Sequence, residues 1–370
     1  MRRILLVLFL ALVAAQPAQA APPPVRASAW IVEDAATGEV LASSDSHAPL
    51  PIASITKLMT VLVALDHERL DDVVAVDRRA AAVGESSANL LPGERLTVRD
   101  LIQAALIQSA NDAADALALS VAPNFTSFAA LMNAKAAQLG LRDTHFVRPD
   151  GLDAVGHVSS AADVTTLARV AMRTRFIRDT VRQKTATIAG GRTLHTWDDL
   201  LALFPETIGV KTGHTSKAGW CQVAAARGRG VTVYATLLGS PTRVDRNDDL
   251  ESLLVWGLDQ FRVVPVVQRD RVYATAGVGY GKAPVELVAA APQLAVARVG
   301  RPLTETVVAR TRVSLPVRRG EVLGRVEIRD GSRVVGRRDL VASRTINKPG
   351  VVGRLGWYAG RTVHHLTQLF

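Results

Sequence analysis

The sequence predicts an α+β protein: a helical cluster followed by an antiparallel sheet, then a small all-β domain and a C-terminal amphipathic helix. Three observations lead to this fold class. Apolar residues recur at helical spacing between residues 54 and 172, strand-like runs separated by Gly and Ser turns follow up to residue 238, and residues 262–348 show no helical pattern. With 370 residues, 48% of them hydrophobic, the chain is long enough for more than one domain.

The first twenty residues have the pattern of a cleaved export signal. Arg2 and Arg3 give a positive start, an apolar run covers Ile4–Ala15, and residues 18–20 (AQA) offer the small side chains that a signal peptidase requires. The apolar run is too short to span a bilayer as a stable helix. We therefore expect residues 1–20 to be a signal peptide that is removed on export.

Residues 25–260 are predicted to form one domain. Apolar runs around Thr37-Gly38 predict a β-hairpin over Ala29–Leu41, and a helical pattern begins at Ser54. Further helices are predicted over Arg99–Gln108, Asp112–Val121, Phe125–Leu139 and Ala161–Met172, and strands over Thr207–Thr212, Gly219–Ala226 and Val231–Leu238.

Residues 262–348 are predicted to form a small all-β domain. Strand-like runs cover Val313–Val317, Arg325–Ile328 and Arg333–Val335, and Asp330-Gly331 is a hairpin turn signal. The glycine-rich stretch at residues 277–282 has the wrong spacing for a phosphate-binding loop, so we interpret it as a turn.

Residues 350–370 are predicted to form an amphipathic helix that lies in a membrane surface. Trp357 and Tyr358 suit a bilayer interface, and basic residues border the apolar stripe. The alternative is a helix packed on the β-domain. The stripe consists of Val352, Leu355, Ala359, Val363, Leu366 and Phe370.

Charge is distributed unevenly along the chain. Residues 261–370 contain 19 Lys/Arg and 7 Asp/Glu, a net charge of +12, whereas the other 260 residues contain 25 and 27. This bias predicts an anionic neighbour for the C-terminal third, either wall polymer or lipid headgroups. No nucleic-acid-binding motif is present, and the single cysteine, Cys221, cannot form an internal disulfide. No HExxH motif or cysteine cluster indicates a metal, and no cofactor is expected.

Three short motifs indicate nucleophilic catalysis. Ser54-Ile55-Thr56-Lys57 is SxxK, Ser109-Ala110-Asn111 is SxN, and Lys211-Thr212-Gly213 is KTG. Each motif is weak alone, because short patterns of common residues arise by chance. Their order, with SxxK at a helix start, SxN between helices and KTG on a strand, is typical of penicillin-reactive serine enzymes.

The chemistry of these residues agrees with the pattern. Ser54 and Lys57 are three residues apart, so a helix places both side chains on one face. Lysine can activate a serine hydroxyl if its pKa is lowered, and we expect crowding beside Lys211 in a semi-buried cleft to lower the pKa of Lys57. Ser54 at a helix start would also meet the positive end of the helix dipole. Gly213 is expected to let a substrate backbone pass close to the strand.

The chain resembles the low-molecular-mass penicillin-binding proteins, the serine-type D-alanyl-D-alanine carboxypeptidases. The resemblance rests on the three motifs and on the surrounding segments over residues 25–260, and extends more loosely to the β-domain and the terminal helix. These segments are PIASITKLMT (51–60), LIQSANDAADALA (106–118), LGLRDTHFVRPDGLD (139–153), VKTGHTSKAGW (210–220) and LVWGL (254–258). It implies a transpeptidase domain shared by serine β-lactamases and penicillin-binding proteins.

The resemblance also implies roles for individual residues. Ser54 would be the acylated nucleophile, Lys57 the base and Ser109 a proton relay. The backbone N–H groups of Ser54 and His214 would form the oxyanion hole. The remaining substrate-binding residues would be Asn111, Lys211, Thr212, Gly213 and Arg246, with Arg243 as the second choice for holding the terminal carboxylate.

Two segments depart from the family pattern. HTWDDLL (195–201) stands where an asparagine-rich turn is usual, and Ser216-Lys217 lacks the usual acidic residue before the lysine. Neither departure removes a catalytic group.

The implied activity is removal of the terminal D-Ala from peptidoglycan pentapeptides, with β-lactams as covalent inhibitors, on the periplasmic face of the cytoplasmic membrane. The alternatives are a D,D-endopeptidase that cleaves cross-links and a non-catalytic wall-binding protein. A β-lactamase is disfavoured because no glutamate-bearing deacylation loop is evident.

Overall fold

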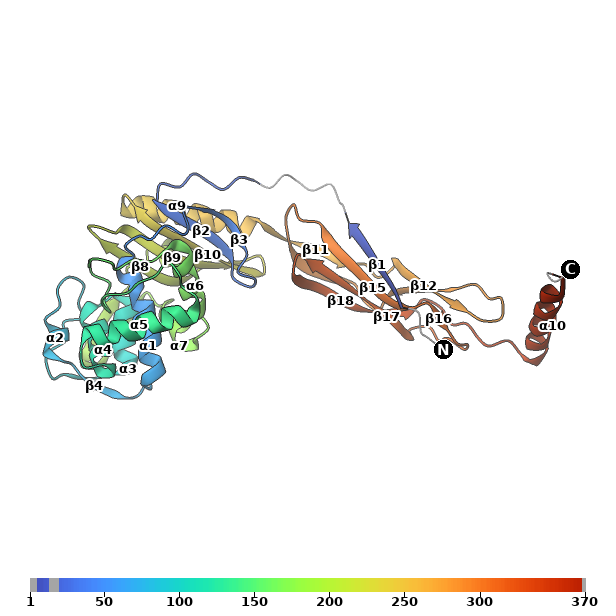
Figure 1. The fold of residues 1–370 in the computed structure, drawn as a ribbon, viewed down its shortest axis with the longest axis horizontal. Helices are drawn as coiled ribbons and strands as arrows, with labels where there is room; N and C mark the ends of the chain where they lie inside the picture. Colours follow the sequence, from blue (N-terminus) through green and yellow to red (C-terminus); the bar gives the residue numbers. More distant parts are fainter. Residues whose placement is uncertain (1–4, 13–19, 368–370) are drawn as a thin grey trace. The chain divides into compact units, whose positions relative to one another are not determined.

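The computed structural model describes residues 5–12 and 20–367 (Figure 1). The chain divides into two compact units, Ala21–Asp259 and a second unit that combines the N-terminal segment with Gln260–Phe370. Most of the predicted cleavage motif at 18–20 lies outside the described residues, and so do residues 368–370 of the predicted terminal helix.

The unit Ala21–Asp259 is built on a five-stranded antiparallel sheet (Figure 1). The predicted hairpin is confirmed, and the three predicted strands that follow it are present and somewhat longer than expected. The strand order is β3 (Val40–Ser44), β2 (Ala29–Asp34), β10 (Val231–Ser240), β9 (Gly219–Gly228) and β8 (Thr207–Thr215).

The predicted helices are present, and three of them, α3, α5 and α6, begin at a side-chain cap. They are α1 (Lys57–His67), α3 (Val98–Ile107), α4 (Asn111–Val121), α5 (Phe125–Leu139) and α6 (Ala161–Ala171). Thr97 forms a capping box with Asp100 at the start of α3, and Asn124 accepts a backbone hydrogen bond at the start of α5. Gly140 ends α5 with φ 74°, a left-handed conformation that glycine adopts without strain.

Several elements were not predicted. They are α2 (Arg78–Ala81), α7 (Arg175–Thr180), α8 (Leu200–Leu203), α9 (Arg243–Asp259) and the hairpins β4 (Val73–Ala75) with β5 (Arg95–Thr97) and β6 (Thr185–Ile188) with β7 (Arg192–His195). Most are short, but α9 spans 17 residues and packs along β9 and β10. Its first half is strongly charged, which conceals the apolar periodicity of its second half.

The segment around Ser54 differs from the expected helix start. Ser54 lies in a 3₁₀ turn, η1 (Ala53–Thr56), which leads directly into α1. The side chains of Lys57–Ala64 are all buried, so α1 is enclosed on every side rather than amphipathic. Ser54 therefore lies at the edge of the main hydrophobic core.

The described part of the second unit has no helix between residues 260 and 348, which agrees with the predicted all-β pattern. A two-stranded sheet pairs β11 (Phe261–Val267) with β14 (Gln293–Arg298). The larger sheet has the order β1 (Leu5–Leu12), β15 (Leu303–Arg310), β17 (Val322–Asp330), β18 (Arg333–Ala342), β13 (Val285–Ala289), β12 (Val272–Val278) and β16 (Arg312–Val313).

Two features of this unit bear on the predictions. The strand expected over Val313–Val317 is reduced to β16 before a cis Leu315–Pro316 bond. The apolar run of the expected export signal pairs as β1 with β15, from Leu5 opposite Arg310 to Leu12 opposite Leu303. The terminal helix α10 (Val351–Thr367) follows the sheet, and among the described residues no helix has the length and hydropathy needed to cross a membrane.

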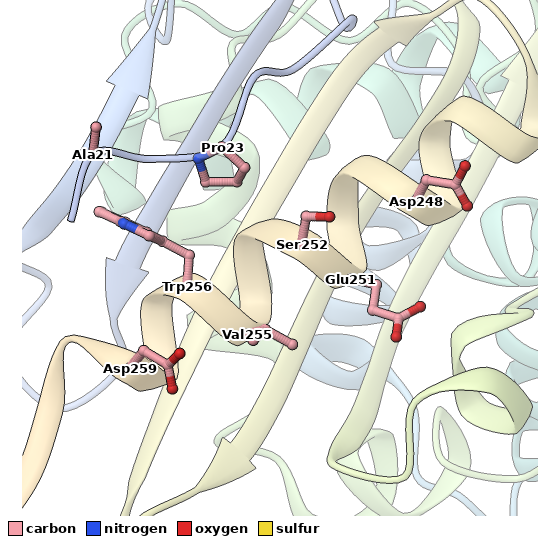
Figure 2. A pocket seen from close by; sticks show the side chains of 8 residues that line it. All are labelled: Ala21, Pro23, Asp248, Glu251, Ser252, Val255, Trp256 and Asp259. Carbon is pink, nitrogen blue, oxygen red and sulfur yellow. The ribbon is translucent and has the colours of Figure 1, made fainter.

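The segment that precedes β2 is fastened to α9. Arg26 forms ion pairs with Asp245 at 2.5 Å and Asp249 at 2.8 Å. Beside this contact, residues 21–23 and α9 border an open groove of about 610 Å³ in which Pro23 and Trp256 face each other (Figure 2). The groove carries the Ser252 hydroxyl and the carboxyl groups of Asp248, Glu251 and Asp259, but none of the SxxK, SxN or KTG residues.

Candidate active site

Ser54 is held in place by a backbone turn that packs on a distant loop. Ala53 adopts φ 49°, a strained conformation for a non-glycine residue, and Thr56 donates a hydrogen bond to the Ala53 carbonyl at 2.8 Å. Gly151 packs against this turn. A Cβ at position 151 would lie 2.2 Å from the Ala53 carbonyl oxygen, so the turn leaves no room for a side chain there. His157 contacts the Thr56 hydroxyl at 2.8 Å, and burial lowers the pKa of His157 to about 4, so its ring is neutral. This packing fixes the serine turn.

Lys57 contacts Ser54, the predicted nucleophile, directly. Its Nζ lies 2.7 Å from Ser54 Oγ, 2.7 Å from Asn111 Oδ1 and 2.7 Å from the Asp150 carbonyl oxygen. A neutral amine has two N–H bonds and one lone pair. Because Asn111 and Asp150 accept the two N–H bonds, the lone pair is directed at the Ser54 hydroxyl.

Burial is the main cause of the perturbed pKa of Lys57. Desolvation lowers the pKa to about 8, and nearby carboxylates, Asp150 first among them, oppose this shift. The predicted direction and the predicted part of burial agree, but Lys211 is not among the main causes of the shift at Lys57. Repulsion between the two lysines instead adds to desolvation in lowering the pKa of Lys211 well below its usual range.

The SxN motif lies in the turn that begins α4. Ser109 has φ 62°, and Asn111 is the first residue of the helix. The Asn111 side chain accepts from Lys57 and donates to the Gly84 carbonyl at 2.9 Å, so both ends of its amide are fixed. Ser109 and Asn111 therefore face the cavity with defined orientations.

The KTG motif lies on β8, beside the serine turn. Lys211 Nζ donates to Ser109 Oγ and to the Thr212 carbonyl, each at 2.9 Å. A Cβ at Gly213 would be 2.8 Å from the Ile52 carbonyl oxygen and 3.1 Å from the Ser54 nitrogen. The backbone of β8 thus packs against the turn that carries Ser54, and this contact, which the sequence did not reveal, is a further reason for glycine at position 213.

These residues share one cavity of about 240 Å³. Lys57 and Lys211 are nearly inaccessible beneath it, and each contacts one of its serines. The cavity is lined by Ser54, Glu85, Ser86, Ser109, Asn111, Leu152, Trp197, Thr212, Gly213, His214, Trp220 and Arg246.

The two candidate arginines occupy different positions. Arg246, on α9, is 1% exposed yet lines the cavity, with its guanidinium 5.6 Å from the centre of the Trp220 ring. Arg243 stacks on Trp197 and is not among the cavity-lining residues. The geometry therefore favours Arg246 as the arginine closer to a bound ligand.

The loop that departs from the family pattern supplies unexpected contacts. Asp199 accepts from Arg246 at 3.0 Å and from Arg243 at 2.7 Å, so one carboxylate holds both arginines. Asp198 is buried, accepts a hydrogen bond from Gln222 at 2.8 Å, and has its pKa raised by desolvation. Trp197 lines the cavity. Sequence reasoning did not assign these residues, although the unusual HTWDDLL segment was the signal.

His214 and Thr212 complete the β8 side of the cavity. The exposed His214 ring lies against Trp220 with 4.1 Å between ring centres, while Thr212 is 7% exposed. Among the described residues no group of His, Cys, Asp and Glu is arranged to hold a metal ion. Cys221 is buried and burial raises the pKa of its thiol to about 12, so it is not a nucleophile at neutral pH.

Comparison with known proteins identifies the family of this site. Residues 16–242 match the family model described as D-alanyl-D-alanine carboxypeptidase. The protein belongs to this family. D-alanyl-D-alanine carboxypeptidase DacD of Salmonella typhimurium is 32% identical over 91% of this chain and 90% of its own.

Solved structures of this family share the fold. The D-alanyl-D-alanine carboxypeptidase of Mycobacterium tuberculosis has a TM-score of 0.63 and 32% identity, covering 66% of this chain and 96% of its own. Penicillin binding protein 5 of Haemophilus influenzae has a TM-score of 0.65 and 24% identity, covering 89% of this chain and all of its own. The predicted fold class is confirmed, with a β-rich C-terminal unit after the catalytic fold.

Proposed function

We propose that this protein is a serine D-alanyl-D-alanine carboxypeptidase that removes the terminal D-Ala from peptidoglycan pentapeptides through an acyl-enzyme on Ser54. Membership of the family supports the activity and the substrate class. The observation that carries the assignment of the nucleophile is the 2.7 Å contact between Ser54 Oγ and a buried lysine amine in a ligand-sized cavity.

In the acylation step, neutral Lys57 takes the proton of Ser54 as Oγ attacks the carbonyl of the penultimate D-Ala. The oxyanion would lie between the backbone N–H groups of Ser54 and His214. The contact between β8 and the serine turn at Gly213 supports this pairing, because it fixes the two backbones against each other. Asn111 would hold a substrate amide.

The leaving group requires a proton. Ser109, whose hydroxyl lies 2.9 Å from Lys211 Nζ, would relay to the D-Ala amine the proton that Lys57 took from Ser54 as the C–N bond breaks, which returns Lys57 to its neutral form. Thr212 and Arg246 would hold the terminal carboxylate. Water then hydrolyses the ester, with Lys57 again as base. A β-lactam would acylate the same hydroxyl. Its ring nitrogen stays attached to the acyl group after the ring opens, and the resulting ester would be hydrolysed slowly.

Labelling with a fluorescent penicillin tests the nucleophile. Ser54→Ala should remove covalent labelling completely while the thermal unfolding curve stays within a few degrees of the wild type. Ser43→Ala, an exposed serine on β3, is the matched control and should label normally. Undiminished labelling of Ser54→Ala would refute the assignment, and so would loss of labelling in the Ser43 variant.

We also propose that the protein is exported and acts at the periplasmic membrane surface. In this proposal residues 1–20 are removed, residues 25–260 form the catalytic domain, residues 262–348 form the β-domain, and residues 350–370 attach the protein to anionic lipid without spanning it. Removal of β1 would make β15 an edge strand. Mass spectrometry of the exported protein should find Ala21 at its N-terminus, whereas a mass that includes residues 1–20 would contradict cleavage.

A further inference from the structure

The catalytic unit contains a second polar cavity that the proposed reaction does not use. Its volume is about 430 Å³, and it lies where α6, the turn after it and α7 meet β10 and the β2–β3 turn. It shares no lining residue with the catalytic cavity. It is lined by Ala35, Ala36, Thr37, Arg169, Met172, Arg173, Arg178 and Tyr234.

Positive charge is concentrated at this cavity. Residues 169–184 contain five arginines and one lysine against a single acid, Asp179, although residues 1–260 as a whole carry a net charge of −2. Three of these arginines, Arg169, Arg173 and Arg178, line the cavity. Such a local excess is unfavourable in the empty protein and favours an anionic ligand.

The acids around the cavity leave part of this charge uncompensated. Glu33 lies 3.4 Å from Arg169 and balances it. The Asp34 carboxylate accepts from the Thr37 hydroxyl at 2.8 Å and the Ala36 nitrogen at 3.1 Å within its own turn. Two guanidinium charges, those of Arg173 and Arg178, therefore remain without an acidic partner.

The unpartnered groups at the cavity are donors. Within the described chain, the Arg173 guanidinium makes no hydrogen bond or ion pair, and Arg178 makes only one side-chain bond, to the Met172 carbonyl at 3.0 Å. Tyr234 is 5% exposed, and its hydroxyl has no hydrogen-bond partner among the described residues. The hydroxyl is not among the fully buried atoms that lack a partner, so its oxygen is accessible from the cavity and can donate to a ligand acceptor there.

We propose that this cavity binds a phosphate group, held by Arg173 and Arg178 with the Tyr234 hydroxyl as a third donor. Two uncompensated guanidinium groups match the charge of a dianionic phosphate, and the planar fork of arginine suits its oxygens. The cavity leaves room for an organic substituent on the phosphate. A lipid headgroup and a soluble phosphate ester share this chemistry.

Titration calorimetry with inorganic phosphate, at ionic strength matched with chloride, tests the site on the full-length protein. Wild type should show saturable binding, and Arg173→Gln should weaken it at least ten-fold. Tyr234→Phe, which removes only the hydroxyl, should weaken it by a smaller factor. Arg182→Gln is the matched control, because Arg182 is an exposed arginine of the same segment that does not line the cavity.

The outcomes separate a site from general surface charge. No saturable binding by wild type, or equal weakening by Arg173→Gln and Arg182→Gln, would overturn the proposal. Glycerol phosphate and phosphatidylglycerol vesicles distinguish the two sources. A vesicle-binding deficit confined to Arg173→Gln identifies a lipid headgroup, whereas loss of glycerol phosphate binding with unchanged vesicle binding identifies a soluble ester. Labelling by penicillin should be unaffected in every variant, so failure of this site is distinguishable from failure of the catalytic assignment.

Discussion

At the scale of single residues, burial controls the chemistry more than the motifs do. Lys57 and Lys211 are 0% and 2% exposed, and both lose proton affinity because a charged amine is poorly solvated there. Solvent exposure would leave the same SxxK and KTG residues protonated and inactive. The motifs supply the groups, and the enclosed cavity makes them reactive.

The pH dependence of acylation follows from Lys57. In the proposed mechanism its neutral form is the base. Because its pKa is lowered to about 8, the rate of acylation by penicillin should rise about ten-fold per pH unit below that value and level off above it. Lys57→Arg should abolish acylation at every pH, because arginine does not lose its proton in this range. Stopped-flow acylation rates between pH 6 and 10 are the measurement. A flat profile would mean that another group is the base.

Asp115 is a buried carboxyl on α4 that the reaction does not use. One of its oxygens has no partner among the described residues, and burial together with nearby Asp150 raises its pKa. In the unfolded state Asp115 loses its proton above about pH 3.9, whereas in the folded state the raised pKa keeps the proton bound to a higher pH. Asp115 therefore lowers stability progressively as pH rises from that value toward the raised pKa.

Asp115→Asn should remove this dependence. The variant should gain stability relative to wild type between pH 5 and 8, by up to about 1.4 kcal/mol per pH unit. Denaturant unfolding across this range provides the measurement. Asp112→Asn is the contrast, because the Asp112 carboxylate accepts from Ser87 at 2.6 Å and from the Ala88 and Leu90 nitrogens, so its replacement should destabilise. Equal effects of the two variants would contradict this reading.

Replacement of Arg246 and replacement of Arg243 should have different effects on peptide turnover. Arg246 lines the cavity and Arg243 does not, although Asp199 binds both. Arg246→Ala should lower kcat/KM for a D-Ala-D-Ala peptide at least ten-fold more than it lowers penicillin acylation, because the peptide presents a free terminal carboxylate to the arginine. Arg243→Ala should have the smaller effect on peptide turnover. A larger loss for Arg243→Ala would reverse the assignment.

At the scale of elements, α9 and the Trp197–Asp199 loop position the carboxylate side of the site. The helix carries Arg246 into the cavity, the loop holds that arginine through Asp199, and Arg26 fastens the start of the helix from outside. None of these contacts is local in sequence. The serine side, by contrast, depends on the short turn η1 and the packing of Gly151 and Gly213 against it.

The element α10 exposes the apolar side chains that a membrane tether requires. Val352 is 85% exposed and Leu355 66%, while Trp357 packs on Tyr280 of the β-domain with 5.3 Å between ring centres. A protein ending at Lys348 should therefore lose co-sedimentation with anionic vesicles and keep full activity on small peptides. Leu355→Gln should weaken vesicle binding several-fold without unfolding the β-domain. Equal sedimentation of full-length and shortened protein would instead make α10 a packing element.

At the scale of the whole molecule, the catalytic unit has its own core. The large hydrophobic cluster runs from Ala29 to Leu238, entirely within Ala21–Asp259, and a separate cluster fills the β-unit. A solved relative from Mycobacterium tuberculosis matches 66% of this chain while covering 96% of its own. The catalytic unit thus has what a domain needs to fold alone.

A protein consisting of residues 21–259 should fold cooperatively and label with penicillin at a rate within about two-fold of the full chain. Thermal unfolding followed by circular dichroism, together with labelling kinetics, provides the measurement. Ser54→Ala in the same shortened protein is the control for specific labelling. Aggregation or a labelling rate reduced ten-fold or more would show that the β-unit supports the catalytic fold.

Local patterns in the sequence by themselves determined the α+β class, the early hairpin, the principal helices, the central strands and the three motifs. Period, capping residues and turn residues act over a few positions, so they can be read from the chain directly. The helix α9 was missed because its charged half hides the period. The 3₁₀ turn at Ser54 was read as helix because both place residues three apart on one side.

Only the tertiary structure decided how these residues act. The contacts of Lys57 with the Asp150 carbonyl and of Lys211 with Ser109 join residues 93 and 102 positions apart. Burial and such distant contacts explain the lowered pKa of Lys57 and the need for glycine at position 213. They also favour Arg246 over Arg243 and form the arginine-lined cavity beside Tyr234. A sequence pattern carries residue identity and local period, whereas desolvation and partner geometry arise only when distant segments pack together.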